Sequence, residues 1–269
     1  DLHYPLRRQR QMCIRDRYRV QKLLSKIGYC SRRSAEQLIE SGKIKINDKI
    51  VSLGDKWYRG DTVKVNDKQI DLTLALDQVV EIIKYYKPIG EVVSMRDSHN
   101  SNSVFDHLPD VKGKWINIGR LDLNTSGLIL FTNNGDLANK IMHPSNNFDR
   151  EYLVETDNPI SHDSMRALLK GVPINDGQIG KFNHISKKRT KTYSIILSTG
   201  KNREIRNSLT QVRIKTISLH RIRYSKILLG DLKPGEHRNL NISEIGQIAG
   251  RAGRYENNGT FSLLKNAGE

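Results

Sequence analysis

The sequence has only two cysteines, Cys13 and Cys30, and no long apolar run. The two cysteines match neither a zinc motif nor a disulfide framework, and the scattered histidines have no close ligand partners. No apolar run reaches the roughly 18 residues of a membrane-spanning helix, and the start of the chain lacks the apolar core of a signal peptide. These absences favour a protein of the reducing cytoplasm that needs no metal and no membrane.

Acidic residues are scarce relative to basic ones. The chain has 29 Asp and Glu against 45 Lys and Arg, which gives a formal net charge of +16. An excess of this size favours a polyanionic partner, and nucleic acid is the first candidate because no basic amphipathic helix stands out. With 269 residues, of which 36% are hydrophobic, the chain can bury one large core or two modest ones.

Changes in periodicity and composition divide the chain into five segments. The first carries five arginines without periodicity, so it can be non-native, and so can the last. We predict a disordered arm or non-native stretch at 1–17, a small domain at 18–70, a linker at 71–78, a larger domain at 79–240, and a tail at 241–269. In the larger domain, apolar strand runs outnumber two helical stretches near 136–142 and 161–169, which indicates an α+β fold.

The small domain reads as two helices and a hairpin. Gly28 ends the first helix, Ser31 is a good N-cap for the second, and Asn47-Asp48 is a hairpin turn between alternating strands. Its segment RVQKLLSKIGYCSRRSAEQLIESGKIKINDKIV resembles the S-four-type RNA-binding domain, which grips structured RNA. The resemblance implies that a basic group contacts RNA, namely Lys22, Lys26, Arg32 and Arg33. A solvated basic face gives the same pattern.

The larger domain contains a polar loop with an acid, GRLDLNTSGLILFTNNGDLA, in which Asp122 precedes an apolar strand. The small polar residues behind Asp122 can fix its carboxylate, which suits a nucleophile. An isolated Asp in such a turn more often only caps the turn. The loop alone therefore leaves both interpretations open.

Three further segments occur with this loop: YKPIGEVVS at 86–94, REYLV at 150–154 and KNREIR at 201–206. In this order they resemble the RsuA and RluB family of ribosomal RNA pseudouridine synthases, and WINIGRLDLNTSGLILFTN with REYLV favours its RluB-like branch. The resemblance runs from Arg19 to Leu240. It implies a central mixed or antiparallel sheet with a cleft. It also implies isomerisation of uridine to pseudouridine in ribosomal RNA, with the large subunit as the favoured substrate and without a cofactor. We expect the chain to act as a monomer.

The same resemblance implies roles for four residues. Asp122 matches the essential aspartate that acts as nucleophile on a flipped-out uridine, and Tyr152 matches the active-site tyrosine. Arg206 matches the basic residue of the third motif and is expected to pair with Asp122, while Arg120 is expected to hold the extruded RNA backbone. Without the family, Tyr152 would read as a core tyrosine on a strand.

A strongly basic stretch surrounds the third motif. From 179 to 226 there are 13 Lys and Arg and a single acid, Glu204. Ordinary solubilising faces mix both signs, so this stretch is predicted to line an RNA track. The residues assigned to the track are Lys188, Arg189, Arg203, Arg221 and Arg223.

Parts of the sequence depart from the family. NSLT at 207–210 replaces an Arg and a bulky apolar helix, and NSNSVF at 100–105 replaces a Gly-Arg loop, which puts substrate choice in doubt. ISEIGQIAGRAGRYENNG at 242–259 resembles the last motif of an RNA helicase. Because the chain has no phosphate-binding loop of the G-x-x-x-x-G-K-[ST] type, neither ATP binding nor a helicase is predicted. The rival to the enzyme is a non-catalytic RNA-binding protein of ribosome assembly.

Overall fold

The computed structural model describes residues 17–72, 79–94 and 102–252. Two compact units make up the structure. The first is the chain up to Val80 with Asp110–Trp115 and Asn133–Gly135, and the second is the remainder. The arm predicted at 1–17, apart from Arg17, lies outside the described residues. So do most of the linker, part of the NSNSVF segment, and the tail after Ala252.

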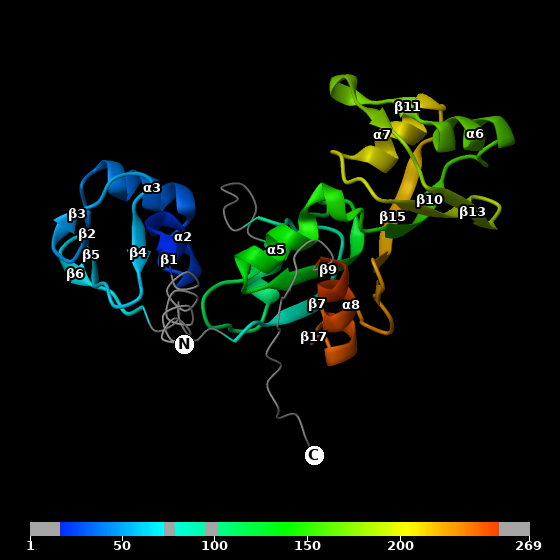
Figure 1. The fold of residues 1–269 in the computed structure, drawn as a ribbon. Helices are drawn as coiled ribbons and strands as arrows, with labels where there is room; N and C mark the ends of the chain where they lie inside the picture. Colours follow the sequence, from blue (N-terminus) through cyan, green and yellow to red (C-terminus); the bar gives the residue numbers. More distant parts are fainter. Residues whose placement is uncertain (1–16, 73–78, 95–101, 253–269) are drawn as a thin grey trace, which may run out of the picture. The chain divides into compact units, whose positions relative to one another are not determined.

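The N-terminal unit has the predicted order of two helices and a hairpin (Figure 1). Ser31 caps the second helix by accepting a hydrogen bond from the Ser34 amide at 3.1 Å. Asn47 and Asp48 turn the hairpin with φ of 48° and 64°, the left-handed values that a tight two-residue turn needs. Its elements are β1 (Arg17–Arg19), α2 (Val20–Lys26), α3 (Arg32–Glu40), β2 (Ile44–Ile46), β3 (Lys49–Ile50), β4 (Lys56–Tyr58), β5 (Val63–Val65) and β6 (Lys68–Gln69).

The larger unit is built on a nine-stranded mixed sheet, so the predicted α+β fold is confirmed. The strands run β13-β14-β10-β15-β9-β7-β17, with β16 beside β15 and β8 beside β9. They are β7 (Ile82–Lys87), β8 (Ile116–Ile118), β9 (Ser126–Thr132), β10 (Arg150–Thr156), β13 (His184–Arg189), β14 (Thr192–Leu197), β15 (Thr216–Tyr224), β16 (Ile227–Leu228) and β17 (His237–Asn239).

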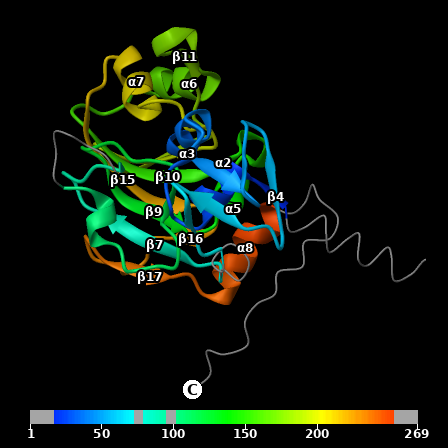
Figure 2. The same cartoon turned by 90° about the vertical axis from the view of Figure 1, so that its left-hand side faces the viewer.

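Helices cover the sheet at both of its ends. The helices are α5 (Gly135–Met142), α6 (His162–Lys170), α7 (Glu204–Gln211) and α8 (Ile242–Ala252), and a ribbon of β11 (Val172–Pro173) and β12 (Ile179–Gly180) lies near α7. In both views α6, α7 and β11 gather together, and α8 lies beside β7 and β17 (Figures 1 and 2). Both predicted helices, α5 and α6, are present. None of the described helices is long and apolar enough to cross a membrane.

A parallel seam joins the two halves of the sheet. Strands β9 and β15 pair only at Ser126 with His220 and at Gly127 with Arg221, whereas the neighbouring pairs are antiparallel. Gly127 has φ of +107°, and a Cβ there would stand 2.2 Å from the carbonyl oxygen of Arg221. Only glycine therefore lets the two strands approach at this point.

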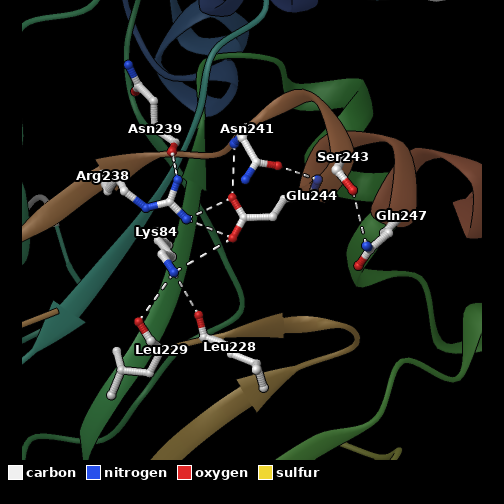
Figure 3. A network of polar contacts seen from close by, with 9 residues as sticks. All are labelled: Lys84, Leu228, Leu229, Arg238, Asn239, Asn241, Ser243, Glu244 and Gln247. Atoms are coloured by element: carbon white, nitrogen blue, oxygen red, sulfur yellow. Dashed lines mark hydrogen bonds and ion pairs between the residues drawn. The ribbon is translucent and has the colours of Figure 1, made fainter. Parts of the chain in front are cut away.

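Helix α8 is clamped onto the second unit although it lies in the predicted tail. Glu244 accepts from the Asn241 amide at 2.9 Å and from Arg238 Nη2 at 2.8 and 2.9 Å, and it lies 3.7 Å from Lys84 Nζ (Figure 3). Ile248 of the same helix is 1% exposed in a core cluster that also contains Leu240. At least the beginning of the tail is thus part of the packed core.

The seam yields a first prediction about stability. Gly127→Ala is expected to lower the free energy of unfolding by more than about 2 kcal/mol, because it combines left-handed backbone strain with a backbone clash. Gly235→Ala is the control, since Gly235 has φ of +83° but open space around its Cα. Urea unfolding of both variants measures the difference. Equal losses would show that the seam tolerates a side chain.

The clamp yields a second prediction, about pH. Burial alone would raise the pKa of Glu244, but hydrogen bonds from Asn241 and Arg238 and the charges of Arg238 and Lys84 lower it. A carboxyl with a lowered folded-state pKa stabilises above its unfolded value of about 4.3 and loses that contribution as the pH falls through the folded value.

Glu244→Gln is therefore expected to cost about 1–2 kcal/mol at pH 7 and much less near pH 3. The exposed Glu155, converted to Gln, is the control and is expected to change stability little at either pH. Urea unfolding at both pH values measures the effect, and a loss that is the same at pH 7 and pH 3 would contradict the clamp.

Candidate active site

Asp122 lies in the loop between β8 and β9, at the entrance to the seam. Its carboxylate is 36% exposed and faces Arg203, whose Nη1 is 3.8 Å from Oδ2. Around it is a pocket with walls from both halves of the sheet. The lining comprises Gly119, Arg120, Leu121, Asp122, Thr125, Arg150, Tyr152, Leu197, Gly200, Lys201, Arg203, Glu204, Ile205, Leu219 and Arg221.

Hydrogen bonds to its carbonyl groups hold the backbone of the Asp122 loop. The Asp122 carbonyl accepts from the Thr125 amide at 3.0 Å and the Leu123 carbonyl from the Gly90 amide at 3.0 Å. Lys87 Nζ donates to the Thr125 carbonyl at 2.9 Å and reaches the Leu123 carbonyl at 3.4 Å. With its carbonyls engaged, the loop backbone that carries the carboxylate is held in place.

Lys87 supports the loop from the end of β7 as a buried cation. Its side chain is 0% exposed. Burial lowers the pKa of its ammonium to about 8, although the negative charges of Glu91 and Asp122 act in the opposite direction. Below about pH 8 the Lys87 ammonium is a positive charge bound by carbonyl groups of the loop that carries the Asp122 carboxylate.

The predicted pairing of Arg206 with Asp122 is corrected by the structure. Arg206 Nη2 donates instead to the Asn124 carbonyl at 2.7 Å, and the ion pair within 4 Å is made by Arg203. Burial and then the charge of Arg203 lower the pKa of Arg206, while Asp122 raises it. Arg206 therefore braces the loop and adds charge near the carboxylate, one turn of helix beyond the residue that faces it.

Arg203 owes its position to the segment before α7. It takes a left-handed backbone, φ 49° and ψ 31°, directly before the helix begins. Glu204, 3% exposed, accepts from the Thr199 hydroxyl at 2.7 Å and from the Lys201 amide at 3.1 Å. Arg150 donates to the Thr199 carbonyl at 2.9 Å. The single acid of the basic stretch thus organises the loop that carries Arg203.

Tyr152 enters the pocket from β10. It is 8% exposed and stands in register with Ile195 on β14 and Arg221 on β15. A largely buried aromatic ring at the pocket wall offers a face that a flat base can stack against. Asp122, Tyr152 and Arg203 are brought together in one pocket although they lie up to 81 positions apart in the sequence.

The residues assigned to an RNA track differ in their surroundings. Arg120 is exposed at the pocket, and Lys188 and Arg189 are exposed on the edge strand β13. Arg221, in contrast, is 1% exposed, and its Nε donates to the Leu128 carbonyl at 2.5 Å. Arg223 Nε binds Glu151 at 2.8 Å.

The assignment of Arg221 and Arg223 as surface RNA contacts is therefore revised. Alternation along β15 turns the Arg221 side chain into the sheet packing, where its guanidinium also lies 5.6 Å from the Tyr224 ring. Arg221 still contributes to the pocket wall. Arg223 is mainly engaged by Glu151.

In the N-terminal unit, the predicted basic group is present around the helix junction. The Lys22 and Lys26 ammonium groups lie 5.6 and 5.2 Å from the Tyr18 ring centroid. Arg32 and Arg33 are exposed in the first turn of α3. Their role as RNA contacts stays a prediction. Across the described residues, no group of three or more His, Cys, Asp or Glu is placed to hold a metal ion.

Three supporting residues escaped the sequence analysis: Lys87, Arg150 and Glu204. All three lie inside motif segments, so their positions were visible, but their type suggested surface charges. Burial of a lysine or glutamate is rare unless it is paired, and only the three-dimensional contacts identify it.

Comparisons with known proteins identify the family of the chain. A family model described as RNA pseudouridylate synthase matches residues 81–223, and an S4 domain model matches residues 19–63. The chain belongs to the RNA pseudouridylate synthase family, and its N-terminal unit carries an S4 domain.

Two relatives of the chain share one name. The chain is 38% identical to the ribosomal large subunit pseudouridine synthase B of Buchnera aphidicola, over 86% of this chain and 96% of that protein. It is 35% identical to the protein of that name from Vibrio cholerae, over 86% of this chain and 74% of that protein. A crystal structure of a pseudouridylate synthase matches its fold with a TM-score of 0.62 and 23% identity, over 86% of this chain and 99% of that one.

The buried lysine under the loop yields a third prediction. Lys87→Met removes the cation that binds the loop carbonyls, so kcat is expected to fall on the order of 100-fold, with KM for RNA changed little. Lys84→Met is the matched control, because this buried lysine of the same strand bonds to the Leu228 carbonyl at 2.9 Å, within the α8 clamp.

Both variants are expected to lose stability, so kinetics are measured well below their unfolding temperatures. Only Lys87→Met is expected to lose kcat. An equal loss of kcat in both variants would indicate general destabilisation and would contradict the role of Lys87 in positioning Asp122.

Proposed function

We propose that the chain isomerises uridine to pseudouridine in ribosomal RNA of the large subunit, with Asp122 as the nucleophile. One observation carries the assignment of this residue. The pocket contains two acids, and Glu204 is buried and already bound by Thr199 and Lys201. Asp122 is the partly exposed carboxylate that can meet a substrate.

The chemistry is a rearrangement without redox change. The bond from C1′ of the ribose to N1 of uracil breaks, the base turns, and a bond from C1′ to C5 forms. One proton leaves C5 and one is gained at N1, so atoms balance without any co-reactant. A nucleophilic carboxylate opens this sequence and is released again once the bond from C1′ to C5 has formed, with Arg203 as its counter-ion at 3.8 Å.

The other pocket residues serve the flipped base. Tyr152 offers a ring face for stacking and a hydroxyl near the proton that leaves C5, which supports its assignment as a catalytic residue. Arg206 supports catalysis through the Asn124 carbonyl and through its charge. Arg120, which is exposed and lines the pocket, is our proposed contact to the RNA backbone from which the uridine is extruded.

The choice of large-subunit ribosomal RNA is supported by the names of the relatives and by the S4 domain. The net charge of +16 suits so large a polyanion. Lys22, Lys26, Arg32 and Arg33 of the S4 domain and Lys188 and Arg189 of β13 are the proposed phosphate contacts. We propose that the reaction takes place in the cytoplasm and that the chain acts as a monomer.

Asp122→Asn provides the direct test. The variant keeps the size of the side chain but loses the nucleophile, so pseudouridine formation on unmodified ribosomal RNA is expected to fall by at least about 1000-fold. RNA affinity is expected to stay within about threefold, because a carboxylate adds nothing favourable to phosphate binding. Mapping of pseudouridine on the RNA measures the product.

Asp163→Asn is the control, since Asp163 is an exposed carboxylate on α6 with 87% of its side chain accessible. It is expected to retain full activity. A wild-type chain that binds ribosomal RNA but forms no pseudouridine, or an Asp122→Asn variant with full activity, would instead indicate a non-catalytic RNA-binding protein.

A further inference from the structure

A second pocket, of about 410 Å³, shares Arg203 with the active site. It lies where the turn after α7 leads into β15. Its lining contains four cations and one acid: Arg203, Arg206, Arg213, Lys215 and Asp157. Thr210, Ile214 and Thr216 complete the lining. The pocket is therefore strongly positive and opens beside the catalytic carboxylate.

The single acid of this pocket has a structural task. Asp157 Oδ1 accepts from the Asn158 amide at 2.8 Å and from the Lys215 amide at 2.9 Å. It thereby fixes the backbone that carries Lys215. None of the ion pairs within the described chain involves Arg213 or Lys215, and both residues are exposed. Two cations are thus left available for a ligand.

Two arginines of the pocket flank α7. Arg203 and Arg213 both have a left-handed backbone, with φ of 49° and 60°. At Arg213 this is a common way for a helix to end, with the Arg213 amide donating to the Thr210 carbonyl and the Ile214 amide to the Leu209 carbonyl. The two ends of one helix thus carry guanidinium groups that line the same pocket.

Two buried polar atoms of the lining residues lack a partner. Arg206 Nε and Thr216 Oγ1 are enclosed and make no hydrogen bond within the described structure. Buried polar groups are nearly always satisfied, so these two atoms can bind an acceptor such as a water molecule or a ligand oxygen. A guanidinium and a hydroxyl both donate to phosphate oxygens.

We propose that this pocket binds a backbone phosphate of the RNA next to the target uridine, which rests on the proposed function of the neighbouring site. The lining contains cations and no aromatic ring, so it fits a phosphodiester better than a base. Because Arg203 contributes to both pockets, the phosphate lies within one side chain of Asp122. A phosphate fixed there holds the strand while its uridine is turned out.

The double variant Arg213→Gln with Lys215→Gln tests the proposal in the full chain. The Kd for ribosomal RNA is expected to rise about tenfold, and the slope of log K against log salt to fall by about 1. Lys170→Gln with Lys233→Gln is the charge-matched control, because both lysines are exposed and line neither pocket.

A second measurement locates the phosphate. Short RNA substrates carry one uncharged methylphosphonate linkage at each position flanking the target uridine. With the wild-type chain, one such linkage is expected to raise Kd about tenfold. With the double variant, the same linkage is expected to change nothing further, because the contact is already lost.

The proposal is overturned if the double variant and its control bind alike, or if every neutral linkage weakens both chains equally. In either case a wild-type chain that still forms pseudouridine leaves the proposed function intact. If the wild-type chain forms none, the loss belongs to the proposed function, and the binding measurements still decide whether the pocket holds a phosphate.

Discussion

The buried ammonium of Lys87 is the interaction on which the active site depends. It lies at the end of β7 and draws together carbonyls of its own strand end and of the Asp122 loop. A cation costs free energy when it is buried, and here the surrounding carbonyl dipoles and the charges of Glu91 and Asp122 offset that cost. The carbonyl groups that stabilise the buried ammonium therefore also fix the backbone of the loop, and this backbone positions the Asp122 carboxylate.

Much of the fold could be predicted because local signals agreed with tertiary packing. The helix capped by Ser31, the turn at Asn47-Asp48 and the apolar strand at 126–132 each combine a pattern with a boundary residue. Helix α7 was missed because Asn, Ser and Thr fill its interior and no capping side chain precedes it. It forms nonetheless, since Ile205 and Leu209 are buried.

The site could be located from the sequence, but its contacts could not. The order of the motif segments identified Asp122 and Tyr152 as pocket residues. Whether Arg203 or Arg206 faces the carboxylate depends on a left-handed backbone that no residue pattern announces. Arg221 was assigned to the surface because arginine is rarely enclosed, and the strand register turned it inward.

The parallel pairing of β9 and β15 bears on how the enzyme can lose its activity. Asp122 precedes one strand of the seam, while Tyr152 and Arg203 come from the half of the sheet beyond the other strand. The two strands meet through two residue pairs, against six between β7 and β9. Parting of the seam would separate Asp122 from Arg203 while each half kept its own hydrogen bonds. Catalytic competence is thus a property of the junction and can be lost while most of the secondary structure persists.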